Sequence, residues 1–347
     1  MQGLVLHAIG DLRLQDVAQP TPSKGEVLVK IQASGVCGSD IPRIFEKGTY
    51  HFPTIPGHEF AGQIVELGEG VDADLLHKKV AIFPLIPCRK CALCQIGEYA
   101  QCKDYNYFGS RCDGGFAEYL AVPLWNLVMV PEALSYEEAA MAEPAAVAVH
   151  ALRQVGVEIG DTVVIFGAGP IGLMLASWAK AWGAYKTILV DIDKGKIEFA
   201  KKLGFEFVID SMECDAIEEI LRLTDGRGAD VCVEGAGVSK TLEQCLFAAR
   251  TFGRVVAMGN PAGEMKLSQK AYWELLRKQL KIAGTWNSSF APLPKNDWTL
   301  AIEAMSTGLL DVKPFITHRV GLADFKPVLE MMRDRSDFYN KVMFIIE

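Results

Sequence analysis

A glycine-rich turn between an apolar strand and a helix constrains the fold of this chain more than any other feature. The apolar stretch 162–166 is followed directly by Gly167, Gly169 and Gly172, in the pattern Gly-x-Gly-x-x-Gly. The first glycine permits a tight turn, the second lets the backbone approach a pyrophosphate, and the third lets the helix lie close to the strand. The helix N-terminus then offers unpaired N–H groups to the phosphates. The pattern therefore predicts a dinucleotide-binding unit.

The segment around this turn alternates short apolar runs with longer helical patterns, from Gly160 to about Gly284. Strict alternation of strands and helices is typical of an α/β fold with a doubly wound parallel sheet, as in the Rossmann fold. The expected strands are 162–166, 187–191, 207–209, 231–234 and 254–259, and the expected helices are 171–182, 194–203 and 239–251.

An acidic residue ends the second expected strand. Asp191 lies 19 positions after Gly172, where 191 − 172 = 19, close to the spacing of about 20 that this type of site uses. A carboxylate there accepts hydrogen bonds from the adenosine ribose and repels a 2′-phosphate, so NAD is favoured over NADP. Lys194 and Lys196 soften this preference, although they also fit a solvated helix start. The predicted cofactor-binding residues are Gly167, Gly169, Pro170, Ile171, Gly172 and Asp191.

Composition excludes several other classes of protein. The 347 residues exceed what one hydrophobic core usually organises, so two domains are expected. The net charge of −8 argues against nucleic acid or an anionic membrane as a partner, because both attract a basic face. We see no signal peptide at the N-terminus. Nine cysteines without a secretion signal point to metal or thiol chemistry in a reducing compartment, so we expect a cytoplasmic protein.

Four of the cysteines form one compact run. Cys88, Cys91, Cys94 and Cys102 follow the pattern Cys-x2-Cys-x2-Cys-x7-Cys. Four thiolates can surround a tetrahedral zinc ion and leave no coordination position open, so this site is expected to be structural. An iron–sulfur cluster is the competing interpretation, because its cysteine spacings overlap.

A second candidate metal site is scattered along the sequence. It comprises Cys37, the adjacent pair His58 and Glu59, and Glu143. Thiolate, imidazole and carboxylate together suit a catalytic zinc that keeps one position open for water or substrate. Each residue also has a simpler explanation: Cys37 as a buried small side chain, His58 as a turn residue and Glu143 as a helix N-terminal carboxylate.

The segments outside the dinucleotide-binding unit predict a different architecture. Short apolar runs such as 26–33, 61–67 and 79–83, punctuated by Gly and Pro, indicate an irregular, mostly β domain. After about Thr285 the chain is expected to form helices and a final strand, 341–346, that return to complete this first domain.

The order of the motifs resembles the zinc-containing medium-chain dehydrogenase/reductase superfamily. The motifs are Cys-Gly-Ser-Asp at 37–40, Gly-His-Glu at 57–59, Asp-Gly-Gly-Phe-Ala-Glu-Tyr at 113–119 and Glu-Pro at 143–144, together with the four-cysteine run and the glycine fingerprint. The resemblance covers nearly the whole chain. It implies a GroES-like catalytic domain at 1–148 and 287–347, and a Rossmann NAD-binding domain at 149–286.

This resemblance also implies roles for the scattered residues. Cys37, His58 and Glu143 would hold the catalytic zinc, and Glu59 is similar to a mobile carboxylate that approaches the metal in some members. Asp40 matches the acid that orients the ligand histidine, which fixes the histidine tautomer. The implied activity is the NAD-linked oxidation of an alcohol.

The proton route and the substrate follow from the same resemblance. Ser39 matches the hydroxyl of the family's proton relay, with His51 as the candidate for a later step. A glutamate ligand in place of a second cysteine resembles the polyol dehydrogenase branch, which acts on a secondary hydroxyl. Arg43 would meet the phosphate of a polyol-phosphate substrate, because a guanidinium suits that group, although a surface ion pair is an equal interpretation.

Other functions and the assembly stay open at this point. An L-threonine dehydrogenase is the main enzymatic alternative, and a nonenzymatic NAD- or zinc-binding protein on the same scaffold is the other. The family implies a homodimer or homotetramer formed through the edge of the Rossmann sheet. We expect the apolar segment 254–259 to pair there across a two-fold axis.

Overall fold

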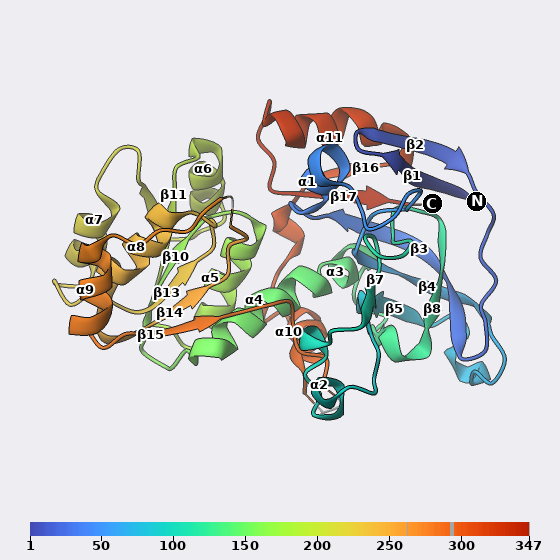
Figure 1. Ribbon diagram of the computed structural model, residues 1–347, viewed down its shortest axis with the longest axis horizontal. Coiled ribbons are helices and arrows are strands. Elements are labelled where there is room, and N and C mark those ends of the chain that lie inside the picture. The colour runs from blue at the N-terminus through green and yellow to red at the C-terminus, as the bar shows by residue number, and fades with distance from the viewer. Residues whose placement is uncertain (262, 292–294, 347) are drawn as a thin grey trace. The chain divides into compact units, whose positions relative to one another are not determined.

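The computed structural model describes residues 1–261, 263–291 and 295–346, which divide into two compact units (Figure 1). The first comprises Met1–Ala146 and Ser289–Glu347, and the second comprises Val147–Ser288. The boundaries of these units lie within three residues of the domain boundaries expected from the sequence. One helix, α4 (Ala142–Val155), begins in the first unit and ends in the second.

The second unit alternates strands and helices in the order β10 (Thr162–Phe166), α5 (Pro170–Ala181), β11 (Lys186–Asp191), α6 (Lys194–Lys202), β12 (Phe207–Asp210), α7 (Ala216–Leu223), β13 (Ala229–Glu234), α8 (Ser239–Ala248), β14 (Ala249–Ala257), α9 (Gln269–Arg277) and β15 (Lys281–Gly284). In the described part of this unit, six parallel strands form one sheet with the order β12-β11-β10-β13-β14-β15. This is the strand order of a dinucleotide-binding Rossmann fold, as the sequence predicted. The central strand β10 is almost fully buried, as an apolar run in a covered parallel sheet must be.

Two sequence predictions for this unit were wrong. The helix expected to reach Thr251 ends at Ala248, because the next residue already begins β14. The segment 254–259 was expected to pair with a second subunit, yet β14 is hydrogen-bonded to β13 on one side and to β15 on the other. A strand with both edges occupied has no free backbone groups to offer, so the available edge at this end of the sheet belongs to β15.

The first unit is mostly β structure, formed by β1 (Gln2–Ala8), β2 (Asp11–Asp16), β3 (Glu26–Val36), β4 (Glu59–Leu67), β5 (Lys79–Ile82), β6 (Leu85–Pro87), β7 (Tyr105–Tyr107), β8 (Tyr119–Pro123), β9 (Leu127–Met129), β16 (Ile316–Val320) and β17 (Lys341–Ile345). Its described residues form a seven-stranded sheet with the order β16-β17-β3-β4-β5-β9, in which β8 also pairs with β3. The last strand, β17, runs antiparallel to β3 although about 300 residues separate them in the sequence. The C-terminal segment therefore completes the first domain.

Short helical segments connect these strands: α1 (Asp40–Pro42), η1 (Arg43–Lys47), η2 (Ala73–Leu75), α2 (Ala92–Gln95), η3 (Tyr99–Gln101), η4 (Leu124–Asn126), α3 (Tyr136–Ala140), α10 (Asp297–Ser306), η5 (Lys313–Phe315), η6 (Leu322–Asp324) and α11 (Phe325–Asp334). The core of the unit contains side chains from β1, β3, β4 and β5, and α11 contributes Val328, Leu329 and Met332 to it. Burial of these apolar side chains fixes β3 and β4 side by side, which matters for the site described below.

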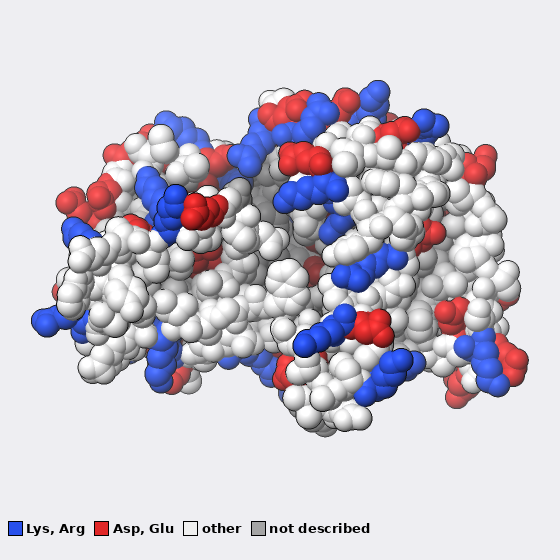
Figure 2. All heavy atoms as spheres, in the orientation of Figure 1, with Lys and Arg blue, Asp and Glu red and all other residues white. Residues whose placement is uncertain are grey.

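The surface carries charged side chains of both signs. On the face drawn in Figure 2, acidic and basic side chains are interspersed and do not form a continuous basic stripe. Within the described residues, no helix combines the length and the apolar character that a membrane span requires.

Candidate metal centres and cofactor site

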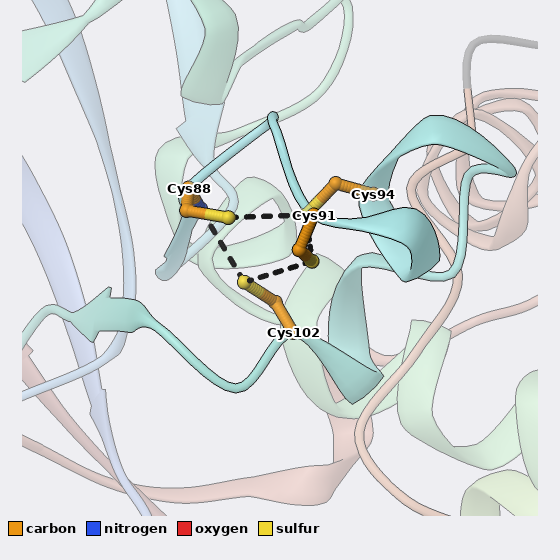
Figure 3. Close-up of side chains that lie close together, drawn as sticks. All are labelled: Cys88, Cys91, Cys94 and Cys102. Atoms are coloured by element: carbon orange, nitrogen blue, oxygen red, sulfur yellow. Dashed lines mark hydrogen bonds between the residues drawn. The ribbon is translucent and has the colours of Figure 1, made fainter.

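The four-cysteine run folds into a small lobe in which the sulfur atoms face one another (Figure 3). Cys88 follows β6 and Cys91 directly precedes α2. Cys94 lies within α2, and Cys102 follows η3. The Sγ atoms of Cys91 and Cys94 are 3.5 Å apart, and those of Cys88 and Cys94 are 3.9 Å apart. Sulfurs on a tetrahedral zinc are separated by about 3.8 Å, because each Zn–S bond is about 2.3 Å long. The donor set and its spacing therefore fit zinc.

The lobe also favours the deprotonated form of one thiol. The backbone N–H of Cys94, together with neighbouring thiols, lowers the pKa of Cys91 to about 6. Burial raises the pKa of Cys94 to about 12. Aromatic contacts attach the lobe to the rest of the domain, since Tyr99 lies edge-on to Trp125 at 4.9 Å between ring centroids.

A second cluster of possible metal ligands lies at the paired ends of β3 and β4. Donor atoms of Cys37, His58 and Glu59 all lie within 4.8 Å of one another. Strand pairing explains this proximity, because Gly35 on β3 is opposite Glu59 on β4. Cys37 follows two residues after Gly35, and His58 directly precedes Glu59. The sheet therefore brings Cys37 next to His58 and Glu59, although Cys37 lies 21 positions before His58 in the sequence, where 58 − 37 = 21.

Asp40 connects two members of this cluster. It is fully buried, and its Oδ2 accepts the backbone N–H of Cys37 at 3.0 Å. Its Oδ1 accepts a hydrogen bond from Nη1 of Arg43 at 2.6 Å. The same oxygen lies 3.3 Å from Nδ1 of His58, but this contact lacks the alignment of a good hydrogen bond. Burial opposes ionisation of Asp40, but His58 and Arg43 outweigh it and lower the pKa of the carboxyl group. Asp40 therefore stays charged and can orient the imidazole.

Glu59 and Lys341 form a buried ion pair at the same place. The Nζ of Lys341 lies 2.6 Å from Oε2 of Glu59 and 3.3 Å from the carbonyl oxygen of Val36. The two charged residues are 3 % and 1 % exposed. Burial opposes the charge of Lys341, but the attraction of Glu59 and Cys37 outweighs it and raises the pKa of the lysine. Sequence analysis missed Lys341; its only signal was a charged residue in a strand that is otherwise apolar.

Glu143 lies beside this cluster but is not one of the three residues whose donor atoms converge. It is the second residue of α4 and is 7 % exposed. Burial raises its pKa to about 7, with an opposing effect from His58 and a supporting one from Glu59. The geometry therefore brings Cys37, His58 and Glu59 together more closely than the expected set with Glu143.

Tyr107, which sequence analysis did not single out, also faces this cluster. Its ring centroid lies 5.9 Å from that of His58. Burial raises its pKa well above the usual value, and the charges of Glu143 and Cys37 act in the same direction. Its position at the end of β7, directly after the four-cysteine lobe, was the available signal.

The structure joins Arg43 to Ser39 through a backbone hydrogen bond of 3.4 Å, but it does not join the two predicted relay residues, Ser39 and His51. Ser39 precedes α1 and is partly buried, whereas His51 is exposed. Among the described residues, His51 Nε2 is paired with the carbonyl oxygen of Arg111 at 3.1 Å, and no hydrogen bond joins His51 to Ser39. Arg43 uses Nη1 for Asp40 and retains 19 % exposure of its side chain.

The glycine-rich turn in the second unit has the expected geometry. Gly167 has φ = 115°, a backbone conformation that residues other than glycine rarely adopt. Gly169 precedes α5 and Pro170 begins it, so Ile171 and Gly172 lie in the first turn. A Cβ atom on Gly172 would collide with the carbonyl oxygen of Gly167.

Asp191 lies at the end of β11, directly beside this turn. Its Oδ2 accepts the backbone N–H of Ala168 at 2.7 Å, and its Oδ1 accepts those of Ile192 and Asp193. These hydrogen bonds fix the carboxylate next to the expected dinucleotide position.

Comparison with known proteins decides the family. The model for the alcohol dehydrogenase GroES-like domain matches residues 23–132, and the model for the zinc-binding dehydrogenase matches residues 170–307. The chain belongs to the zinc-containing medium-chain dehydrogenase family. Galactitol 1-phosphate 5-dehydrogenase of Escherichia coli K12 is 34% identical over 99% of this dehydrogenase and 100% of the relative. Sorbitol dehydrogenase of Bacillus subtilis 168 is 32% identical, over 95% and 93% of the two chains.

Solved structures agree with this assignment. The crystal structure of galactitol-1-phosphate dehydrogenase from Escherichia coli has a TM-score of 0.91 to this dehydrogenase, with 35% identity over 99% of this chain and 100% of that one. Two further similar structures carry a nicotinamide cofactor: a putative zinc-binding dehydrogenase of Sinorhizobium meliloti 1021 bound to NADP, and an alcohol dehydrogenase of Escherichia coli CFT073 complexed with NADH. The family uses zinc and NAD(P), so these are the cofactors of this dehydrogenase.

Proposed function

We propose that this dehydrogenase oxidises a secondary hydroxyl of a polyol phosphate, with galactitol 1-phosphate as the best candidate, to the ketose phosphate with NAD+. The observation that carries the proposal is the convergence of Cys37, His58 and Glu59 at the ends of two paired strands, with Glu143 beside them. A thiolate, an imidazole and a carboxylate leave one position of a tetrahedral zinc open, as a catalytic site requires.

In this proposal Cys37, His58 and Glu59 hold the metal, and Asp40 fixes the first two. When bound, zinc acts as a Lewis acid on the substrate oxygen, and NAD+ accepts the hydride from the adjacent carbon. Asp40 accepts the N–H of Cys37 and faces Nδ1 of His58, so Nε2 is the ring nitrogen that would bind the metal. Ser39 receives the hydroxyl proton and passes it outward, with His51 as the candidate for the later step.

Two carboxylates compete for the third ligand position. The distances support Glu59 in the resting site, because Glu143 does not converge with the other donors. Glu143 remains the ligand implied by the family resemblance, and the effects of His58 and Glu59 on its pKa support a position beside the cluster.

The phosphate group of the substrate needs a cation near the metal. Arg43 remains a candidate, although Asp40 occupies one of its nitrogens. Arg111 is a second candidate: its guanidinium lies 4.0 Å from the ring centroid of Tyr50 and 4.3 Å from that of Tyr105. Stacking leaves the edge of a guanidinium available for a bidentate phosphate contact. The backbone N–H of Arg111 donates a hydrogen bond to the carbonyl oxygen of Tyr107. The ring of Tyr107 lies beside His58, so the backbone of Arg111 is tied to a neighbour of the proposed metal site.

The test is initial rates of NADH formation on galactitol 1-phosphate, galactitol, sorbitol, xylitol and L-threonine. We expect a preference for the phosphorylated polyol, and we expect R111Q and R43Q to reduce that preference. A preference for free polyols would identify a sorbitol- or L-iditol-type dehydrogenase, and a preference for L-threonine would identify an L-threonine dehydrogenase. Nucleotide binding without turnover of any alcohol would identify a binding protein.

The NAD preference and the assembly are parts of the same proposal. Gly167, Gly169, Pro170, Ile171, Gly172 and Asp191 form the cofactor site, and the carboxylate of Asp191 disfavours a 2′-phosphate. For the homodimer, the edge strand β15 supplies exposed apolar side chains, as do the helix before it and the residues after it. These side chains are Tyr272, Trp273, Leu276, Ile282 and Trp286.

The dimer proposal can be tested directly. Light scattering of wild type should give a dimer or tetramer, and I282E should shift it towards the monomer, because a charge in a paired apolar edge is costly. All nine cysteines are described and free, which supports a reducing, cytoplasmic location.

A further inference from the structure

Lys341 has an unusual environment for a lysine. Its side chain is 4% exposed, and its ammonium contacts Oε2 of Glu59 and the carbonyl oxygen of Val36. Val36 directly precedes Cys37, and Glu59 directly follows His58. The last strand of the chain therefore places a cation between the two segments that carry the proposed metal ligands.

Gly35 closes the other side of the same carboxylate oxygen. A Cβ atom on this residue would collide with Oε2 of Glu59. Oε2 is thus enclosed by the backbone of β3 and by the ammonium of Lys341, whereas no hydrogen bond engages Oε1 of Glu59 within the described part of the chain.

The charges around the site explain why a cation is needed. A buried anion is costly unless a cation or a metal compensates it. One divalent metal cannot neutralise four anions, and the two buried or half-buried cations supply the remainder. With the metal bound, the anionic groups would be Cys37 as thiolate, Asp40, Glu59 and Glu143; the cations are Arg43 and Lys341.

We propose that Lys341 is a positioning residue of the catalytic centre: its ammonium holds Oε2 of Glu59, so that this carboxylate binds the metal through Oε1 alone and the fourth position stays open to substrate. This inference rests on the proposed catalytic metal site. Without the ammonium, the metal becomes the nearest cation to both oxygens of Glu59. The carboxylate would then bind through both oxygens and fill the fourth position.

The experiment compares K341M with wild type in the metal-loaded enzyme. Methionine keeps an unbranched apolar side chain of similar length and removes the charge. K79M is the matched control, because Lys79 is also a buried lysine of this domain but donates to the backbone carbonyls of Glu132 and Leu134. K341R, which retains the charge, is the rescue variant.

Three readouts distinguish positioning from a merely structural role. In K341M we expect zinc loss to a chelator at the catalytic site to slow roughly tenfold, because the ammonium no longer repels the metal and Oε2 of Glu59 becomes a ligand. The visible absorption spectrum of Co2+ at that site should change, because Oε2 of Glu59 replaces water as the fourth ligand. We expect KM to rise about tenfold with a smaller change in kcat, because substrate competes with Oε2 of Glu59 for the metal. K341R and K79M should resemble wild type in all three readouts.

An unchanged Co2+ spectrum and an unchanged or faster zinc loss in K341M would overturn the inference. If K341M does not fold, K341Q takes its place with the same expectations. Failure of the proposed function has a different signature: wild type would then bind zinc only in the four-cysteine lobe, and C37S would not alter its metal content. If wild type binds metal at Cys37 but K341M has the same Co2+ spectrum as wild type, only this inference is rejected and the proposed function stands.

Discussion

The two candidate metal centres lie in the same domain but are built in different ways. In the four-cysteine lobe, all donors come from 15 consecutive residues, 88–102, and are identical in type. In the second centre, a thiolate, an imidazole and a carboxylate meet only because β3 pairs with β4, and a lysine from β17 joins them. The lobe depends on local spacing, whereas the second centre depends on the tertiary fold.

This difference has a chemical consequence. Four thiolates fill a tetrahedral metal and exclude substrate, so the lobe can stabilise structure but cannot catalyse. Three unlike ligands leave one position, and the groups around them are buried and charged. A centre that is assembled by the fold can therefore be surrounded by groups such as Asp40 and Lys341, which contact its proposed ligands His58 and Glu59.

The largest expected effect separates the two centres by activity. C37S should reduce kcat/KM on the order of 10³-fold or more, because the Lewis acid contributes several kcal/mol to transition-state stabilisation. Elemental analysis should show that only the zinc of the catalytic site is lost, and the melting temperature should change little. Full activity in C37S would show that this cluster is not the catalytic centre.

The lobe should respond in the opposite way. C94S removes a buried ligand from the lobe, and the metal-dependent free energy of folding is lost with it. We expect the melting temperature to fall by about 5 °C or more, while kcat/KM of the folded fraction stays within about threefold of wild type. Differential scanning calorimetry with parallel assays at low temperature checks this. A large loss of activity in fully folded C94S would contradict the division of roles.

Asp40 should sharpen the contrast, because it supports only one centre. D40N keeps the size of the side chain but removes the charge that faces His58 and Arg43. We expect zinc affinity at the catalytic site to fall by about 10- to 100-fold, with the lobe unaffected. Competition with a chromophoric chelator measures both sites. An equal loss from the lobe would indicate general destabilisation instead.

The smallest effect concerns pH. In the metal-free protein, the raised pKa of Glu143 means that this carboxyl group is protonated below about pH 7. A nearby dication favours the carboxylate, so zinc binding displaces this proton and zinc affinity falls as the pH drops below 7, by about tenfold per pH unit for each proton displaced.

E143Q isolates this contribution. The variant lacks the titrating group, so zinc binding at the catalytic site should release one proton fewer between pH 6 and 7. The slope of log zinc affinity against pH should become correspondingly smaller. The lobe provides the internal control, because its pH dependence should not change. Identical slopes in wild type and E143Q would show that Glu143 does not respond to the metal.

Sequence alone predicted those features that depend on neighbouring residues. The glycine turn, the strand β10 and the spacing of Asp191 were predicted because turns and buried parallel strands impose local residue types. The four-cysteine lobe was predicted from spacing for the same reason.

Features that depend on strand pairing were predicted less well. The expected subunit contact at 254–259 was wrong, because no local pattern distinguishes an interior parallel strand such as β14 from an edge strand such as β15. Lys341 was missed because its partner Glu59 is 282 positions away. Tyr107 was missed because one aromatic residue in a short hairpin carries no signal before the position of His58 is known.

The central claim is that hydride transfer depends on the metal held by Cys37, His58 and Glu59. The most direct measurement is NADH formation from galactitol 1-phosphate by enzyme whose catalytic site has been emptied by a chelator while the lobe keeps its zinc. The account predicts that activity disappears in proportion to the metal removed and returns when zinc is restored. Undiminished activity in enzyme verified to lack metal at this site would contradict it.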